Sequence, residues 1–220
     1  MNSNILITYP TGSPAPYLAD AFRQRGAQVQ LAVPKAYLTA GALISHAERL
    51  LGPLDLILNL VPEPNPELTR NIHLSDSLLS PLSIIEFAAS HLIARHSLTP
   101  DAQLTRRTPT VATCLTLIPS PVVYAPVTTL RRNGLPKAHL GATPKYDPEV
   151  QPTAVATLAA LVHATRTAAA EARAAPAPVR FNTLIYDATL LTLIDAIMAV
   201  LTDTAPLKNG ATRLIRPQLP

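Results

Sequence analysis

The stretch ILITYPTGSPAPYLADAFRQRGAQVQLAV, residues 5–33, contains the alternation that decides the fold. It opens with an apolar run at residues 5–7, crosses a proline-rich turn and continues over residues 17–25 with apolar side chains at helical spacing. Gly26 follows the last helical residue, and a second apolar run covers residues 29–33. This order, in which a helix ended by glycine joins two strands, predicts the start of a parallel sheet, because parallel strands need a crossover connection.

The same alternation continues to the end of the chain. We predict further strands and helices in turn, with the strands at residues 54–60, 111–118, 179–185 and 211–215 and the helices at residues 43–51, 75–95, 153–174 and 189–201. This order favours an α/β fold, a doubly wound parallel sheet with helices on both faces. Of the 220 residues, 48% are hydrophobic and 15% charged, so we predict a single folded domain over residues 1–220.

The composition argues against several classes of function. The net charge is +4, but the basic residues are scattered, so we expect no nucleic-acid binding. The apolar runs are too short to span a bilayer, and the first residues lack the pattern of a signal peptide. Cys114 is the single cysteine, which favours a reducing, cytoplasmic compartment, and its apolar neighbours predict a core position. The six histidines make no zinc spacing with Cys114, so we expect no metal site.

Four segments, in their order along the chain, match the pattern of one known family. Residues 5–33 match its opening strand, glycine turn and helix, and LDLILN at residues 54–59 matches its fourth strand and the start of an Asn-Asn-Ala-Gly motif. Residues 171–183, ending in VRFNT, match the end of its catalytic helix and the next strand; residues 193–215 match its last helix and strand. The chain thus resembles the short-chain dehydrogenase/reductase family over nearly its whole length. The resemblance implies a Rossmann-like fold, here with a truncated substrate lid at residues 186–189.

The resemblance also implies a glycine turn for NAD(P) after the first strand, and this chain lacks it. The three glycine positions hold Tyr9, Ser13 and Ala15, with prolines among them. A pyrophosphate needs close approach to backbone N–H groups, and proline has no N–H to donate. The second predicted strand ends without an acidic residue for the ribose. We therefore expect this chain alone to bind no cofactor.

The catalytic pair of the family is missing as well. Its tyrosine transfers the proton and its lysine, four residues later, lowers the pKa of that tyrosine. The matching positions hold Ala154 and Leu158, and neither side chain can move a proton. We therefore predict that the chain is catalytically inactive alone, a non-catalytic subunit of an oxidoreductase complex.

Two alternatives remain open for the function. The fold could support other, NAD(P)-independent chemistry, with Ser120, Tyr124 or Tyr146 near the family's site. The chain could also be a free-standing binding or regulatory protein.

The two long predicted helices, residues 75–95 and 153–174, resemble the pair that forms the family's main dimer interface. Both are apolar over more than one stripe, which leaves a second face to cover, unless these residues only face their own sheet. The predicted interface residues are Leu78, Leu82, Ile85, Ala154, Leu158, Leu161 and Ala169. The resemblance implies an active paralogue as partner, a heterotetramer with two subunits of each kind, and a hydroxyacyl or ketoacyl thioester as substrate.

Overall fold

The computed structural model describes residues 3–10, 13–33, 39–61, 80–98, 111–119, 151–175, 178–186, 190–202 and 207–215. The strands are β1 (Asn4–Thr8), β2 (Gln28–Ala32), β3 (Leu56–Leu60), β4 (Ala112–Pro119), β5 (Val179–Tyr186) and β6 (Thr212–Ile215). The helices are α1 (Ala15–Gln24), α2 (Ala40–Leu51), α4 (Ser80–Leu98), α6 (Gln151–Ala174) and α7 (Leu190–Leu201). Every predicted strand and helix is present. The first residues predicted for α4, 75–79, lie outside the described part.

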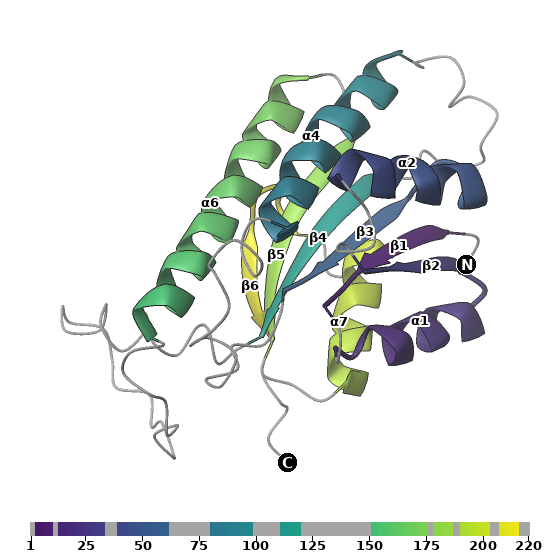
Figure 1. Ribbon diagram of the computed structural model, residues 1–220, viewed down its shortest axis with the longest axis horizontal. Helices are drawn as coiled ribbons and strands as arrows, with labels where there is room; N and C mark the ends of the chain where they lie inside the picture. Colours follow the sequence, from purple (N-terminus) through teal and green to yellow (C-terminus); the bar gives the residue numbers. More distant parts are fainter. Residues whose placement is uncertain are drawn as a thin grey trace.

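All six strands pair in parallel in one sheet, in the order β2-β1-β3-β4-β5-β6. The chain starts at β1, moves outward to β2, crosses back to β3 and then winds outward to β6 (Figure 1). This reversal confirms the predicted doubly wound α/β fold. Every residue of β3 and β4 is buried, as expected for central strands of a sheet that is covered on both faces.

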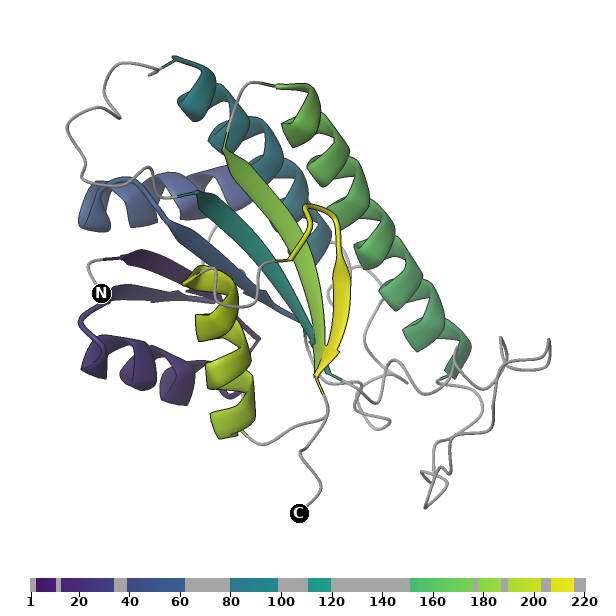
Figure 2. The same cartoon turned by 180° about the vertical axis from the view of Figure 1, so that it is seen from behind.

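Helices α2, α4 and α6 cover one face of the sheet, and α1 and α7 cover the other (Figures 1 and 2). Successive side chains of a strand point to opposite faces, so each strand contributes to two cores. Leu6 belongs to the apolar cluster beneath α2, α4 and α6, whereas Ile5 and Ile7 belong to the cluster beneath α1 and α7. In the part of the chain that the structure describes, no helix is both long and apolar enough to cross a membrane.

Gly26 ends α1 as the sequence predicts. Its φ is 85°, a left-handed conformation that glycine adopts without strain. Its N–H donates to the carbonyl of Arg23 at 2.9 Å, and the N–H of Ala27 donates to the carbonyl of Phe22 at 3.1 Å. This pair of bonds is the Schellman motif, which satisfies the last helical carbonyls and turns the chain toward β2.

α2 begins three residues earlier than predicted, because a cap and a helix contact decide its start. The hydroxyl of Thr39 accepts a hydrogen bond from the N–H of Ala42 at 3.1 Å. Gly41 sits in the first turn, and a Cβ there would lie 2.6 Å from the ring of Phe87 on α4. Glycine has a low helix propensity, so Gly41 weakens the sequence signal for a helix at this position. The close approach of α2 to α4 depends on tertiary packing and could not be predicted from the local sequence.

Candidate functional site

The carboxyl-terminal edge of the sheet is where a doubly wound fold holds its ligands, at the point where the strand order reverses. Here the reversal lies between β1 and β3. The turn from β1 into α1 contains the three predicted glycine positions, Tyr9, Ser13 and Ala15. The same edge includes the last residue of β4, which Ser120 follows in sequence.

Within the described residues, the first three positions of α1 leave a single N–H group for an anion. The N–H of Ala15 donates to the hydroxyl of Ser13 at 3.4 Å. Pro16 has no N–H. The N–H of Tyr17 remains. Because several N–H groups at a helix N-terminus normally hold a pyrophosphate, this turn is poorly suited to one.

Side chains also occupy the space beside this turn. Ala15 stands at one glycine position, is fully buried and packs into the apolar cluster beneath α1 and α7. Tyr9 stands at another, is half-buried and packs against the same cluster. Thr11 and Gly12 lie outside the described residues. The described residues therefore do not fit the pyrophosphate of NAD(P) at this turn.

Leu158 on α6, which the sequence predicts at the position of the family's lysine, is a core residue. Its side chain is 8% exposed and belongs to the cluster beneath α2, α4 and α6. Ala154 lies in the first half of the same helix, and its side chain is outside the described part. Ser120, Tyr124 and Tyr146 also lie outside the described residues, so a site built on them stays a prediction.

A row of buried polar side chains crosses the sheet near its carboxyl edge. Thr8, Asn59, Thr116 and Thr183 are register partners on β1, β3, β4 and β5, and each is at most 1% exposed. In-register residues of parallel strands point to the same face, so the row faces the helical layer of α2, α4 and α6. This row was not predicted from the sequence. Its signal in the sequence is the presence of polar residues inside otherwise apolar strands, and only the strand register brings these residues together.

Half of this polar row is paired. The hydroxyl of Thr8 donates to Oδ1 of Asn59 at 3.1 Å, and Nδ2 of Asn59 donates to the carbonyl of Pro81 at 2.9 Å. Asn59 thus ties β1 and β3 to the first turn of α4. The hydroxyls of Thr116 and Thr183 have no hydrogen-bond partner in the described part of the chain. An unsatisfied buried hydroxyl costs about 1–3 kcal/mol, so unused hydrogen-bonding capacity remains between β4 and β5.

Cys114 is buried on β4, which confirms its predicted core position. Burial raises the pKa of its thiol from 9.0 to about 12. The nucleophilic form of cysteine is the thiolate, so at neutral pH this side chain acts as a small apolar residue. Across the described ranges, no group of three His, Cys, Asp or Glu side chains could hold a metal ion.

A charged cluster joins α2 to α4 at the other edge of the sheet. Glu48 contacts Nε2 of His91 at 2.7 Å and forms an ion pair with Arg95. Arg95 also donates to the carbonyl of Leu54, just before β3, at 3.0 Å. These contacts hold two helices and a strand entrance together, and we assign them a structural role.

The structure turns most of the predicted interface residues inward. Four of them are at most 8% exposed and belong to the chain's own core: Ile85, Leu158, Leu161 and Ala169. Leu82 is partly buried against the same core, whereas Leu78 and the side chain of Ala154 lie outside the described part. α4 and α6 pack against each other as well as against the sheet, so each buries more than one stripe (Figures 1 and 2). These four side chains therefore face their own sheet and the neighbouring helices.

A partner on this layer would contact other residues. The outward surface of α6 presents exposed small and polar side chains at helical spacing: Ala156, Ala159, His163, Thr167 and Ala170. Small side chains allow a second helix to approach closely. Any assembly through α6 would therefore use these residues in place of the buried ones.

Neither a protein-family model nor a curated protein matches this sequence. Solved structures with a similar fold do match. A 3-ketoacyl-(acyl-carrier-protein) reductase from Brucella melitensis, complexed with NADH, is 15% identical, with a TM-score of 0.60 and coverage of 96% of both chains. A short chain dehydrogenase from Mycobacterium smegmatis is 15% identical, with a TM-score of 0.60 over 100% of this chain and 94% of that chain. The NADH-dependent reductase A1-R', responsible for alginate metabolism, is 16% identical, with a TM-score of 0.58 over 98% of this chain and 96% of that one.

These comparisons contradict the prediction that the chain is not an enzyme. The structures that share its fold over nearly the whole length are those of reductases and a dehydrogenase. The prediction rested on the replacements at Ala154 and Leu158, and two replaced side chains do not show that a chain with this fold is inactive. What the comparisons establish is the architecture: the chain has the Rossmann-like fold of the short-chain dehydrogenases and reductases.

Proposed function

We propose that the chain is a subunit of an oxidoreductase of the short-chain dehydrogenase/reductase class, and that this enzyme works as an assembly of chains with the same fold. The whole-length structural match to reductases carries the proposal. In the described part of the chain the sheet has the doubly wound order and an apolar core on each face, which is the framework that positions an active site in this class.

The proposed substrate is a hydroxyacyl or ketoacyl thioester. The match to a 3-ketoacyl-(acyl-carrier-protein) reductase supports this choice. Reduction of the ketone needs a hydride on carbon and a proton on oxygen, and the proton needs a donor within hydrogen-bonding distance. In this chain the candidate donors are the hydroxyls of Ser120, Tyr124 and Tyr146, because Ala154 and Leu158 cannot supply one.

The nucleotide is proposed to bind to the assembly and not to the turn at α1 of the isolated chain. Support comes from the first three positions of α1, where among the described residues only the N–H of Tyr17 remains for an anion, and from the packing of Tyr9 and Ala15. No proton or hydride step is assigned to that turn.

The proposed partner is a second chain of the same fold, in a heterotetramer with two copies of each. Support comes from α4 and α6, which lie side by side and form the outer layer of one face (Figure 2). The exposed alanines of α6, Ala156, Ala159 and Ala170, would let a partner helix come close.

The test uses the full chain, tagged and purified from the cells that naturally make it, under conditions that keep assemblies intact. Light scattering after gel filtration gives the mass of the assembly. Reduction of acetoacetyl coenzyme A with NADH and with NADPH gives the activity. We expect an assembly larger than one chain that reduces the thioester.

Three variants then test the proton donor, Ser120→Ala, Tyr124→Phe and Tyr146→Phe. Removing a general acid costs about a hundredfold to ten-thousandfold in rate, so one variant should lose turnover on that scale while the assembly keeps its mass. An intact assembly whose turnover is unchanged within a few-fold in all three variants would refute the proposed donors. A chain that purifies as an active monomer would refute the proposed assembly.

A further inference from the structure

β2 lies at one edge of the sheet, where it pairs with β1 alone among the described strands (Figure 1). In a parallel ladder, successive residues of a strand direct their backbone N–H and C=O groups to opposite sides. The N–H of Gln28 donates toward β1, to the carbonyl of Ser3, at 2.9 Å, so the even-numbered residues of β2 face β1. Val29 and Leu31 therefore direct their backbone groups to the open edge of the sheet.

The open-edge carbonyl groups of β2 are both occupied by side-chain donors. Nη2 of Arg23, in the last turn of α1, donates to the carbonyl of Val29 at 3.1 Å. Nε2 of Gln30 donates to the carbonyl of Leu31 at 3.0 Å. Asp20 orients the guanidinium, because its Oδ1 accepts from Nη1 of Arg23 at 3.1 Å. A further strand at this edge would need the same carbonyl groups as acceptors.

The strand itself has none of the features that usually protect an edge. Its sequence, QVQLA, contains no charged residue and no proline, and its five residues pair with β1 in an unbroken register. Edge strands in natural proteins are commonly protected by charges, proline or bulges. Among the described residues, the capping of the carbonyl groups by Arg23 and Gln30 takes the place of these features.

The strand that fits this edge is β2 of a second copy. If two copies pair antiparallel about Gln30, Val29 of one copy lies opposite Leu31 of the other. These are the residues with open-edge groups, and directly opposite residues of an antiparallel ladder exchange both N–H···O=C bonds in such a position. Twofold symmetry makes the two pairs equivalent, so every open-edge N–H and C=O group of Val29 and Leu31 would find a partner.

We propose that Arg23 and Gln30 keep the open edge of β2 closed to β2 of a second copy. The guanidinium and the side-chain amide occupy the positions from which the N–H groups of the other copy would bind. Pairing would also bring Arg23 of both copies to one interface, where like charges repel. The inference goes beyond the proposed function and does not depend on it, since α4 and α6 cover the other face of the sheet from α1.

A thiol at position 30 reports this pairing directly. Antiparallel pairing about Gln30 places residue 30 opposite itself in a non-hydrogen-bonded position, with Cα atoms about 4.5 Å apart, which a disulfide can span. Gln30→Cys removes one capping side chain, and Arg23→Ala removes the other. The native thiol of Cys114 is buried and does not compete.

The full chain with both changes is purified, mildly oxidised with oxidised glutathione and compared with Gln30→Cys alone. Two Arg23 hydrogen bonds, one in each copy, must break before the edges can pair with Arg23 present. We therefore expect about tenfold more disulfide-linked dimer from the double variant. The side chain of Arg23 is 46% exposed, so Arg23→Ala should keep the fold, which circular dichroism verifies.

Arg25→Ala combined with Gln30→Cys is the matched control. Arg25 is exposed directly after α1, and its Nη1 donates to the carbonyl of Ala21 within that helix at 2.9 Å. This change removes the same charge as Arg23→Ala but leaves the carbonyl of Val29 capped. The control should therefore form no more dimer than Gln30→Cys alone.

Arg23→Ala combined with Gln30→Thr tests the pairing without a new thiol. Light scattering should show a mass that rises reversibly with concentration to twice that of the unchanged chain. The inference is overturned if Arg23→Ala adds no disulfide-linked dimer or if Arg25→Ala adds as much. It is also overturned if the thiol-free variant keeps the mass of the unchanged chain at every concentration, or forms only irreversible aggregates.

Discussion

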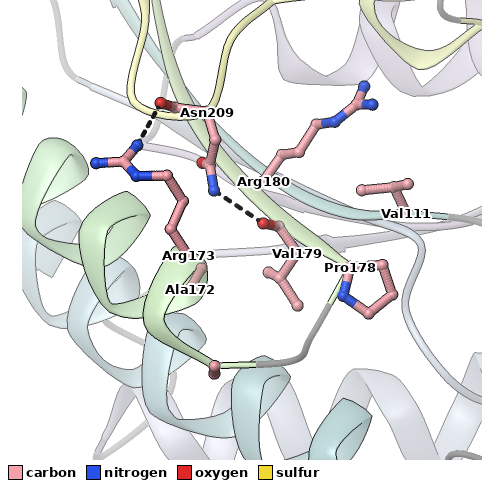
Figure 3. A pocket seen from close by; sticks show the side chains of 8 residues that line it. Val111, Ala172, Arg173, Pro178, Val179, Arg180 and Asn209 are labelled. Atoms are coloured by element: carbon pink, nitrogen blue, oxygen red, sulfur yellow. Dashed lines mark hydrogen bonds between the residues drawn. The ribbon is translucent and has the colours of Figure 1, made fainter.

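Asn209, in the turn before β6, ties β5 and α6 to that turn through its side chain (Figure 3), and its removal should destabilise the fold measurably. Its Oδ1 accepts from the N–H of Phe181 on β5 at 2.7 Å. Its Nδ2 donates to the carbonyl of Val179 at 3.1 Å and to that of Ala169 on α6 at 3.4 Å. Phe181 is fully buried, and its N–H loses this partner once the amide is gone.

The expected cost of Asn209→Ala follows from these contacts. A buried donor left without a partner costs about 1–3 kcal/mol, and each lost hydrogen bond about 0.5–1.5 kcal/mol. We discount the 3.4 Å contact with Ala169 for its length and expect a total of about 2–4 kcal/mol. For a chain of 220 residues, each kcal/mol lowers Tm by about 2–4 °C, so Tm should fall by about 5–15 °C.

Thermal unfolding monitored by circular dichroism is the assay, and Lys208→Ala is its control. Lys208 precedes Asn209 and is exposed, so that change should stay within about 0.5 kcal/mol. Asn209→Asp keeps an oxygen for the N–H of Phe181 but turns a carboxylate oxygen toward the carbonyl of Val179. Its Tm should therefore also fall. If Asn209→Ala lowers Tm no more than Lys208→Ala does, the side chain of Asn209 does not hold these elements together.

Three further predictions concern the core and the proposed assembly. Leu161→Arg places a charge in the core of the isolated chain and should cost about 3–5 kcal/mol or abolish folding. Ala170→Arg lies on the exposed side of α6, so it should leave Tm unchanged and reduce the mass of the assembly in gel filtration. Thr116→Val and Thr183→Val each remove an unpaired buried hydroxyl, so the free energy of unfolding measured by chemical denaturation should stay unchanged or rise by about 1 kcal/mol. A loss of similar size would show that water or another group pairs with that hydroxyl. Burial raises the pKa of the Cys114 thiol from 9.0 to about 12, so its contribution to stability is fully present below pH 9.0 and should be lost as the pH rises toward 12, by up to about 1.4 kcal/mol per pH unit. Cys114→Ala should remove this part of the pH dependence when the free energy of unfolding is measured at several pH values.

The sequence determined the architecture because local patterns carry it. Gly26 predicted the end of α1 and occupies the left-handed position found there, since few other residues adopt that conformation without strain. The continuous apolar runs of β3 and β4 predicted strands buried on both faces, and the structure buries every residue of both. The order of strands and helices then left the doubly wound sheet as the natural topology, because crossovers between parallel strands are right-handed.

The direction of side chains on the long helices could not be read from the sequence. An alanine-rich helix is apolar nearly all around, so its composition does not reveal which stripe faces the sheet. Leu161 and Ala169 were expected at an interface and lie in the core, because α6 packs against α4 as well as against the sheet. Burial on such a helix depends on its neighbours.

The sequence by itself determined the order of the elements and the positions of their ends within a few residues. Only the tertiary structure decided which distant residues meet. The buried row from Thr8 to Thr183 exists because strand register aligns residues that are far apart in the chain. The side chain of Asn209 bonds to β5 and α6 because α6, the start of β5 and the turn before β6 meet at one edge of the sheet. Local propensity acts over neighbouring residues, whereas these two features depend on packing between elements.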